Sequence, residues 1–269
     1  MSAPNEITPN QLIRLLGTPE APVVVDVRID ADFDDDPCLV PTAIRIPHRD
    51  LPAIQDAARG GKIVVTCQKG KKLSQGVVAW LRADGTDAEY LGGGNLGWRD
   101  SGMPCVPAAA VPARSEGATL WVTRHRPKID RIACPWLIRR FIDPQARFLF
   151  VSPGEVADVA DRFGATPFDI EGTFWSHRGD KCTFDTMVEE FALDLPALHS
   201  LAAVVRAADT NRHDLVPQAA GLLAISVGLS RQFRDDHQQL SAGMTLYDAL
   251  YRWARDGQNE GHDWPASRG

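Results

Sequence analysis

The sequence has no excess of basic residues. Its 35 Asp and Glu outnumber its 29 Lys and Arg, which gives a formal net charge of −6 at pH 7. Affinity for nucleic acid or for an anionic lipid surface comes largely from Lys and Arg that face phosphates. We therefore expect neither a nucleic acid nor a membrane among the partners.

Long apolar runs and a secretory leader are also missing. The longest mostly apolar run, residues 215–229, is interrupted by Pro217, Gln218 and Ser226 and is too short to span a bilayer. Residues 1–6 have neither the basic start nor the apolar centre of a signal peptide. These features predict a cytoplasmic protein.

The cysteines are few, and none of them are spaced as in a typical disulfide or metal-binding motif. The sequence holds five, an odd number, and no Cys-x-x-Cys motif. They are Cys38, Cys67, Cys105, Cys134 and Cys182. The pattern suits reduced thiols in the cytosol and argues against a structural zinc knuckle.

The first 107 residues alternate between strand and helix patterns. Thr8, Pro9 and Gln11 predict a helix start with an N-cap, a proline in the first position and a capping box. Strands are expected at 23–27, 43–46, 62–66 and 88–91, and a further helix at 74–82. This alternation predicts an α/β domain, a parallel sheet flanked by helices.

Residues 108–117 are rich in Pro and Ala and predict a linker. In the second domain, residues 118–269, strands at 120–123 and 147–151 flank a helix at 135–142. Helical patterns follow at 183–191, 196–208, 217–227, 231–240 and 245–255. We expect a mainly helical α+β domain.

The segment 66–74 (TCQKGKKLS) places Cys67 between the end of a strand and the start of a helix. A turn around Gly70 can point successive backbone N–H groups inward, and the helix adds its positive end. Three lysines, Lys69, Lys71 and Lys72, add positive potential, which favours the reactive thiolate. The alternative is a buried structural cysteine beside a solvated lysine run. The order of these features favours a functional cysteine.

This loop, with VDVR (25–28), PTAIRIP (41–47) and LGGG (91–94), resembles the rhodanese domain over about the first hundred residues. The resemblance implies that the Cys67 thiolate attacks a sulfane sulfur, carries it as a persulfide and delivers it to a thiol or cyanide. It also implies a small anionic donor such as thiosulfate and no required cofactor. The donor and persulfide would be held by Gln68, Lys69, Gly70, Lys71 and Lys72.

Two positions depart from the family pattern. Lys72 stands where many rhodaneses have Arg, so it offers a point charge instead of a planar fork. Thr42 stands where the family has glycine, so we expect the glycine turn to be absent. Related phosphatases place Arg six positions after the cysteine, where this chain has Leu73, which cannot hold a phosphoryl group. Phosphatase and arsenate reductase activities are disfavoured.

The second domain carries a long recognisable run, WVTRHRPKIDRIACPWLIRRFID (121–143). With segments 176–185, 205–209 and 247–251, it resembles the C-terminal domain of ChrB-type chromate-resistance proteins over about residues 118–265. The resemblance implies a setting of chromate resistance and assigns no reaction. Because a rhodanese-like region replaces the N-terminal region of ChrB-type regulators, DNA binding is not implied.

Three interpretations of this domain remain open. The first is a site for a chromate-like oxyanion, because basic side chains crowd the turn before a helix; the alternative is a solvated basic turn. These side chains are Arg124, His125, Arg126, Lys128 and Arg131.

The second interpretation is a divalent metal site for Zn, Fe or Mn. His177, Asp185 and Asp209 offer nitrogen and oxygen ligands, with Asp236 as a further candidate. Their spacing is not diagnostic, since Asp185 and Asp209 could simply stabilise helix ends and His177 could be a hydrogen-bonded loop residue.

The third interpretation concerns thiols. Pro135 suits the first position of a helix, which would make Cys134 the N-cap, where the helix dipole lowers a thiol pKa. Such a thiol could accept sulfur from Cys67, although a plain core cysteine is the alternative. Cys182, just before another predicted helix, carries the same ambiguity.

We therefore expect a cytoplasmic sulfurtransferase that works through a Cys67 persulfide and is associated with resistance to chromate or oxidative stress. The alternative is a non-catalytic sensor or regulatory protein that binds an oxyanion or a metal ion.

Overall fold

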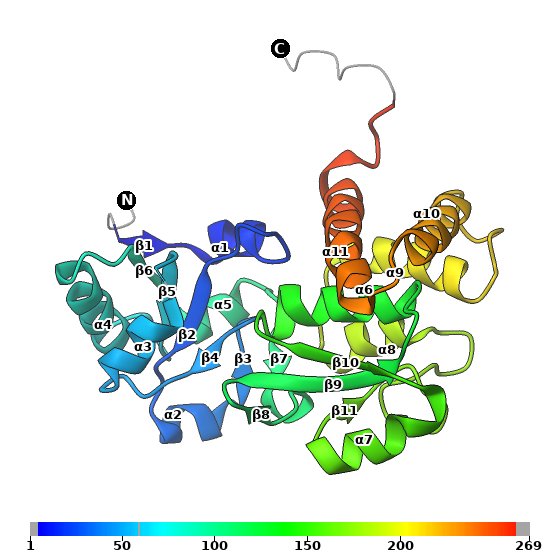
Figure 1. Ribbon diagram of the computed structural model, residues 1–269. Helices are drawn as coiled ribbons and strands as arrows, with labels where there is room; N and C mark the ends of the chain where they lie inside the picture. The colour runs from blue at the N-terminus through cyan, green and yellow to red at the C-terminus, as the bar shows by residue number, and fades with distance from the viewer. Residues whose placement is uncertain (1–4, 59, 262–269) are drawn as a thin grey trace. The chain divides into compact units, whose positions relative to one another are not determined.

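The computed structural model describes residues 5–58 and 60–261 (Figure 1). The chain forms two compact units. The first comprises Met1–Thr119, Leu137–Arg147 and Glu190–Leu193, and the second comprises Leu120–Trp136, Phe148–Glu189 and Asp194–Gly269. Residues 1–4, most of the segment considered for a signal peptide, lie outside the described part.

The first unit contains a five-stranded sheet in the order β1-β6-β5-β2-β4, and every strand pair in it is parallel. The strands are β1 (Glu6–Ile7), β2 (Val23–Asp26), β4 (Ile44–Arg45), β5 (Ile63–Thr66) and β6 (Ala88–Leu91). The helices are α1 (Pro9–Leu15), α2 (Asp30–Asp35), α3 (Leu51–Ala58), α4 (Lys72–Ala83) and α5 (Gly94–Asp100). The expected α/β architecture is confirmed.

Hydrophobic cores cover both faces of this sheet. In β5, Ile63 and Val65 pack with residues of α3 and α4, whereas Val64 packs with Leu12 of α1 and Trp98 of α5. This alternation explains the continuous apolar run of β5, because a parallel strand with helices on both faces has no solvent side.

The start of α1 follows the prediction in detail. The Thr8 side chain accepts a hydrogen bond from the amide of Gln11, and the Gln11 side chain accepts one from the amide of Thr8. Pro9 occupies the first helical turn. Two backbone donors that a helix start leaves unpaired are satisfied in this way.

Thr42 adopts the conformation that a glycine would favour. Its φ is +67°, and the amide of Ala43 donates to the carbonyl of Val40 to close the turn. The expected loss of this turn is therefore wrong, because the chain keeps the turn with a β-branched residue. Left-handed backbone costs an L-residue about 1–2 kcal/mol, and the buried Thr42 hydroxyl has no hydrogen-bond partner among the described residues.

The stretch 108–117 is more ordered than the expected linker. It contains a short 3-10 helix, η1 (Ala108–Ala110), and the strand β8 (Arg114–Ser115), which pairs antiparallel with the start of β9 (Ala118–Arg124). Glu116 and Gly117 connect them with φ values of +51° and +82°. Two successive positive φ angles are typical of a tight hairpin turn, which twists in the sense that paired strands require. Upstream, β3 (Cys38–Leu39) and β7 (Val106–Pro107) form a separate antiparallel pair.

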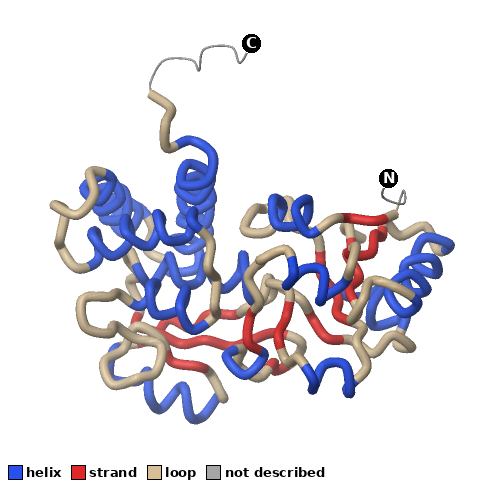
Figure 2. The backbone as a smooth tube through the Cα atoms, turned by 180° about the vertical axis from the view of Figure 1, so that it is seen from behind, coloured by secondary structure: helices blue, strands red, loops and turns tan. Residues whose placement is uncertain are grey.

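In the second half of the chain, β9 lies between β10 (Arg147–Val151) and β11 (Thr166–Pro167). The later part is mainly helical, as expected (Figure 2). The α-helices are α6 (Asp130–Leu137), α7 (Val156–Phe163), α8 (Thr183–Glu190), α9 (Pro196–Asp209), α10 (Gln218–Gln232) and α11 (Asp236–Arg252). Short elements are η2 (Ile138–Ile142), η3 (Pro153–Glu155) and η4 (Trp253–Gly257).

Two helix predictions in this half are wrong. The helix expected to begin at Pro135 begins at Asp130, and Pro135 lies inside it. Burial of Ile132, Ala133 and Cys134 stabilises the turn before the proline. The two helices expected at 231–240 and 245–255 are joined in one continuous helix, α11, which runs from Asp236 to Arg252 through the expected break. Gly243 lies within α11, where a Cβ atom would overlap a methyl group of Ile132, so this glycine permits close packing. Within the described residues, none of the helices combines the length and apolar character needed to cross a membrane.

Candidate functional site

Cys67 follows β5 and precedes α4, at the edge of the sheet where the parallel strands end. Its side chain is almost buried, and its Sγ lies 3.2 Å from the Oγ of Ser74 in the first turn of α4. The Ser74 hydroxyl also lies 3.3 Å from the carbonyl oxygen of Lys71, to which it can donate. Ser74 can therefore accept from the thiol or turn its proton toward a thiolate. Ser74 was predicted as the first residue of this helix, with no role in the chemistry.

The carbonyl groups of the loop point away from its centre. The carbonyl oxygens of Cys67 and Gln68 accept hydrogen bonds from the amides of Asn95 and Leu96, at 3.0 and 3.1 Å. Across a planar trans peptide, the carbonyl of one residue and the amide of the next point in opposite directions. The amides of Gln68 and Lys69 therefore point inward.

The second half of the loop follows the same rule. The carbonyl of Gly70 accepts from Nε2 of Gln75 at 3.1 Å, and the carbonyl of Lys71 accepts from the amide of Gln75 at 2.9 Å. The amides of Lys71 and Lys72 are thereby turned to the opposite side. Within residues 5–58 and 60–261, the amides of residues 68–71 donate to no protein acceptor. The residues that follow Cys67 thus offer N–H groups that are free to bind an anion, as in an amide nest.

Close glycine contacts hold this loop in place. Gly70, with φ +63°, lies so near the neighbouring segment that an added Cβ would be 2.5 Å from the carbonyl oxygen of Leu91 and 2.7 Å from the amide nitrogen of Gly94. The Thr66 hydroxyl donates to Oδ1 of Asn95 at 2.7 Å. Two backbone segments can approach this closely only where side chains are missing.

The three lysines of the loop, Lys69, Lys71 and Lys72, are exposed. No ion pair engages them within the described part of the chain. The Gln68 side chain is half-buried, and its Oε1 has no described hydrogen-bond partner. The free lysine charges surround the amide nest and raise the local concentration of anions.

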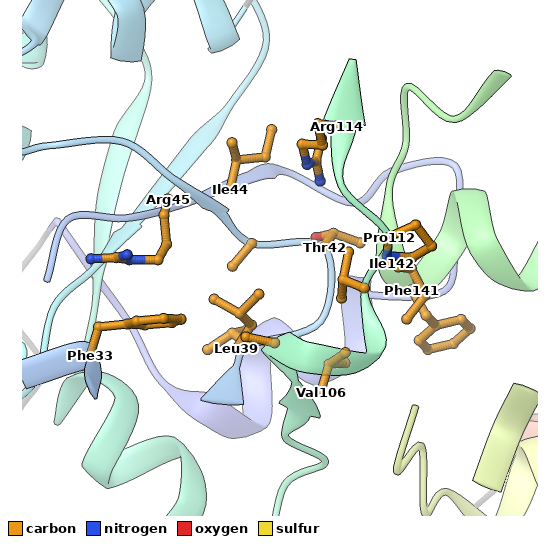
Figure 3. A pocket seen from close by; sticks show the side chains of 14 residues that line it. Phe33, Leu39, Thr42, Ile44, Arg45, Val106, Pro112, Arg114, Phe141 and Ile142 are labelled. Carbon is orange, nitrogen blue, oxygen red and sulfur yellow. The ribbon is translucent and has the colours of Figure 1, made fainter. Parts of the chain in front are cut away.

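A separate pocket of about 280 Å³ in the first unit is mainly apolar (Figure 3). The guanidinium of Arg45 lies 3.8 Å from the ring centre of Phe33 beside it. The pocket is not lined by residues of the Cys67 loop, so it is not a donor site for that sulfur.

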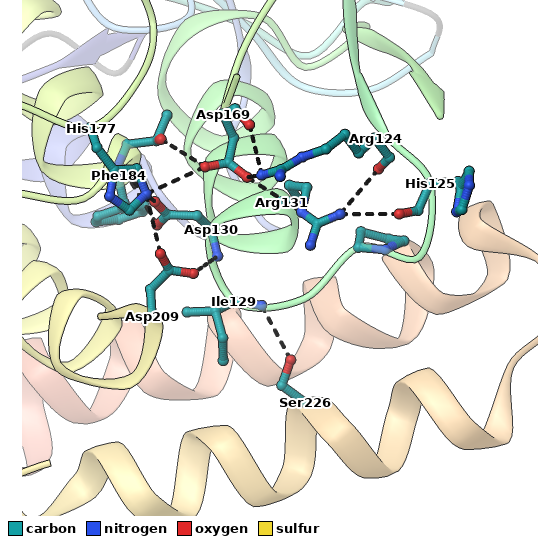
Figure 4. A network of polar contacts seen from close by, with 12 residues as sticks. Arg124, His125, Ile129, Asp130, Arg131, Asp169, His177, Phe184, Asp209 and Ser226 are labelled. Atoms are coloured by element: carbon teal, nitrogen blue, oxygen red, sulfur yellow. Dashed lines mark hydrogen bonds and ion pairs between the residues drawn. The ribbon is translucent and has the colours of Figure 1, made fainter. Parts of the chain in front are cut away.

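In the second unit, two of the basic residues predicted to hold an oxyanion contact a carboxylate instead. Nη2 of Arg124 and Nε of Arg131 lie 3.0 and 3.3 Å from Oδ2 of Asp169 (Figure 4). Burial opposes ionisation of Asp169, but the hydrogen bond from His177 and the two guanidinium charges lower its pKa below the ordinary value. His125 is exposed, and its carbonyl accepts from Nη1 of Arg131 at 3.0 Å. The structure thus brings Arg124 and Arg131 together around an internal anion.

His177 lies at the centre of three carboxylates (Figure 4). Its Nε2 is 3.2 Å from Oδ2 of Asp209, 3.4 Å from Oδ1 of Asp169 and 3.5 Å from Oδ2 of Asp130. These carboxylates, with Asp130 contributing most, raise the pKa of His177 to about 12. Of the predicted metal ligands, His177 and Asp209 are brought together. Asp130 and Asp169, which were not predicted as ligands, join them.

Asp130 is completely buried, and it also holds the start of α8. Its Oδ2 accepts from the amide of Thr183 at 2.6 Å, and its Oδ1 accepts from the amide of Phe184 at 3.4 Å. Burial raises the pKa of Asp130 to about 7, and the neighbouring charges of Asp209 and Asp169 add to this. The sequence did contain a signal that these two carboxylates matter. Asp130 is the first residue of the family run DRIACPW, and Asp169 stands between two apolar residues, Phe168 and Ile170.

Asp185 and Asp236 lie outside this group. Oδ1 of Asp185 pairs with Nη1 of Arg206 at 2.7 Å, and its Oδ2 accepts from the amide of Cys182 at 3.0 Å. Oδ1 of Asp236 accepts from the amide of Arg126 at 3.0 Å. The structure thus gives both carboxylates partners within the fold.

The two second-domain cysteines are fully buried. Cys134 lies within α6, so its expected position as an N-cap is wrong. Burial, together with the charge of Asp130, raises the pKa of Cys134 and of Cys182 well above the ordinary value. Neither environment favours a thiolate.

Two known protein families match the chain. Residues 8–101 match the model of the rhodanese-like domain, and residues 121–254 match the model of the ChrB C-terminal domain. The protein thus combines a rhodanese-like domain with a ChrB C-terminal domain, and both resemblances are confirmed. It is 30% identical over 195 residues to Protein ChrB of Cupriavidus metallidurans, a match that covers 67% of this chain and 59% of that protein.

Two solved structures to which parts of the chain are similar have rhodanese in their names. One is a rhodanese-related protein from Thermoplasma volcanium, with 25% identity, a TM-score of 0.33 and coverage of 38% of this chain and 97% of that one. Another is a rhodanese-like domain protein from Staphylococcus aureus, with 28% identity, a TM-score of 0.31 and coverage of 35% and 90%.

Proposed function

We propose that the protein is a sulfurtransferase that carries sulfur as a persulfide on Cys67. The observation that supports this most strongly is that the backbone amides of residues 68–71, which directly follow Cys67, donate to no acceptor within the described residues. A persulfide anion needs hydrogen-bond donors around its terminal sulfur, and preorganised backbone amides supply them without reorganisation.

The proposed reaction has two steps, each with an anionic substrate. The Cys67 thiolate attacks the outer sulfur of thiosulfate; an S–S bond forms to Cys67, the S–S bond of thiosulfate breaks, and sulfite leaves with the electron pair. Cyanide or a thiolate then attacks the terminal sulfur of the persulfide. The Cys67 thiolate leaves and is regenerated. Ser74, 3.2 Å from the sulfur, can donate a hydrogen bond to the thiolate at the start and end of the cycle.

The exposed lysines suit the donor in this scheme. Thiosulfate is a dianion, and Lys69, Lys71 and Lys72 are unpaired within the described residues. Replacing all three by Gln should raise KM for thiosulfate by roughly tenfold at low salt and weaken its salt dependence. A smaller effect on kcat is expected, because the lysines attract the donor and the amides hold the reacting sulfur.

We further propose that this activity serves resistance to chromate, a setting consistent with the similarity to Protein ChrB. In a strain that lacks the gene, wild type should restore growth on chromate and Cys67→Ser should not. A strain restored equally by both would support the regulatory alternative, in which sulfur turnover has no part.

The direct test is transfer of sulfur from thiosulfate to cyanide, measured as thiocyanate. Wild type should turn over, and after thiosulfate alone its Cys67 peptide should gain the mass of one sulfur atom. Cys67→Ser should lose activity by at least about a thousandfold. Cys105→Ser, which removes another thiol of the same domain, is the matched control and should keep it. Equal turnover by wild type and Cys67→Ser would overturn the proposal.

A further inference from the structure

The carboxylates around His177 come from separate elements of the second unit. Asp130 begins α6, Asp169 follows β11, His177 lies in the loop before α8, and Asp209 ends α9. One ligand atom from each of Asp130, His177 and Asp209 lies within 4.8 Å of the other two. The fold therefore brings one nitrogen and two carboxylate groups to one point.

Hydrogen bonding alone does not explain this arrangement. Nε2 of an imidazole carries at most one proton, so it can donate to one acceptor at good geometry. Three carboxylate oxygens nevertheless surround it at 3.2, 3.4 and 3.5 Å, and none lies at the 2.7–2.9 Å typical of a charge-assisted bond.

The distances match those between ligands of a metal ion. Ligand bonds of about 2.0–2.1 Å in a tetrahedral site place neighbouring ligand atoms roughly 3.3–3.4 Å apart. The Nε2 of His177 lies 3.2 Å from Oδ2 of Asp209 and 3.5 Å from Oδ2 of Asp130. The ligand oxygens of Asp130 and Asp209 lie within 4.8 Å of each other, and a bound ion would draw them closer together.

The distribution of positive charge supports the same conclusion independently. Asp169 and Asp185 each pair with arginine, Asp169 with Arg124 and Arg131 and Asp185 with Arg206. Asp130 and Asp209 have no Lys or Arg partner within the described residues, although the Asp130 side chain is completely buried. A buried carboxylate is neutralised by a proton, a cationic side chain or a metal ion, so a metal ion could serve Asp130 and Asp209, which no described Lys or Arg serves.

We propose that Asp130, His177 and Asp209 bind one divalent first-row transition metal ion, of the class Zn²⁺, Fe²⁺ or Mn²⁺. One nitrogen and two oxygen ligands suit these ions. Three protein ligands leave at least one coordination position open for water. Asp169 lies beside these ligands: Arg124 and Arg131 hold its Oδ2, and its Oδ1 accepts from the Thr183 hydroxyl at 3.0 Å. It would therefore act by positioning His177, whose Nε2 is 3.4 Å from that Oδ1.

This site differs by one residue from the metal ligands predicted from the sequence, since Asp130 takes the place of Asp185. The two carboxylates therefore lead to opposite expectations for metal affinity when each is replaced. Asp130→Asn should lower metal affinity by at least about tenfold, whereas Asp185→Asn should leave it within about twofold. The proposal does not depend on Cys67 or on sulfur transfer.

The experiment uses full-length protein without a histidine tag. Elemental analysis after purification, and then titration of chelator-treated protein with Zn²⁺, Fe²⁺ under nitrogen or Mn²⁺, should give about one ion per chain. His177→Ala and Asp209→Asn should reduce binding by tenfold or more. His199→Ala is the matched control, since His199 is an exposed histidine that pairs with Asp194 at 2.8 Å. This variant should bind like wild type.

Co²⁺ provides a readout that does not require a folded variant. Wild type loaded with Co²⁺ should show visible d–d absorption that Zn²⁺ abolishes in proportion to occupancy. A folded wild type that binds none of these ions more tightly than about 0.1 mM would overturn the proposal. Equal affinity in wild type and a folded His177→Ala would also overturn it. In either case, protonated His177 would be the cation that the carboxylates require.

Discussion

Gly94 approaches Cys67 so closely that a Cβ atom at position 94 would overlap the carbonyl oxygen of Cys67. The φ of Gly94 is +62°, so this residue meets both a conformational and a steric requirement for glycine. The contact fixes the first peptide of the loop and, with it, the inward direction of the Gln68 amide.

Gly94→Ala should therefore displace the Cys67 loop. We expect a loss of several kcal/mol in the free energy of unfolding, because backbone atoms cannot move aside as a flexible side chain can. Gly102→Ala is the matched control: Gly102 also has a positive φ of +70°, but an added Cβ would meet nothing within 4 Å. It should lose only about 1–2 kcal/mol. Denaturant unfolding measures both variants, and similar losses would contradict the role of the contact.

Thr42→Gly should stabilise the protein by about 0.5–1 kcal/mol. Relief of the left-handed backbone contributes about 1–2 kcal/mol, and the greater flexibility of glycine in the unfolded chain offsets part of this gain. The variant also removes the buried hydroxyl that lacks a described partner.

Thr42→Ala separates these two effects, because it removes the hydroxyl and keeps the strained φ. Chemical denaturation should rank the Gly variant above the Ala variant. A Gly variant less stable than wild type would show that Thr42 stabilises the turn in another way.

The thiols should differ sharply in their reactivity with iodoacetamide. Cys134 and Cys182 are buried and have raised pKa values, so at neutral pH they should resist alkylation in the folded protein and react only after unfolding. A hydrogen bond from Cys38 lowers the pKa of Cys105, which is partly exposed, so Cys105 should react at least about tenfold faster. Peptide mass analysis of a labelling time course would test this. Early labelling of Cys134 would contradict the buried environment described for it.

The three tyrosines should titrate only at unusually high pH. A hydrogen bond to Glu6 raises the pKa of Tyr90, and burial raises those of Tyr247 and Tyr251. Because the folded-state pKa values exceed the ordinary value of about 10, their stabilising contribution is complete below pH 10. It is lost as the pH rises through the folded values.

Absorbance at high pH distinguishes these states. In urea, all three tyrosines should ionise near pH 10, whereas in the folded protein little tyrosinate should form there. Tyr90→Phe should leave the signals of Tyr247 and Tyr251 unchanged. Full ionisation of the native protein at pH 10 would contradict the burial and the hydrogen bond.

Local patterns predicted the first domain well, because its elements depend on neighbouring residues. Thr8 and Gln11 are three residues apart, and their reciprocal hydrogen bonds could be predicted from that spacing. Cys67 could be recognised because strand, thiol, glycine turn and helix are consecutive. The left-handed backbone of Thr42 could not be predicted, since threonine gives no sign that the surrounding fold imposes a positive φ.

The site in the second domain is formed by residues that are far apart in the sequence and meet only in the folded protein. Asp130 and Asp169 meet His177 only after β11, α8 and α9 are assembled, so neither could be paired with it in advance. Pro135 was misread because proline usually starts a helix, whereas burial of the preceding residues extends α6 in front of it. Asp185 had the right residue type, but Arg206 already balances its charge.

The interleaving of the two units has a consequence for how the chain is made. The first unit includes Leu137–Arg147 and Glu190–Leu193, which the ribosome releases after the opening part of the second unit. The first unit therefore cannot complete its folding until residue 193 has been synthesised. A gene cut after residue 117 would encode a first unit without these two segments, so the first half of the chain should not be expected to fold alone.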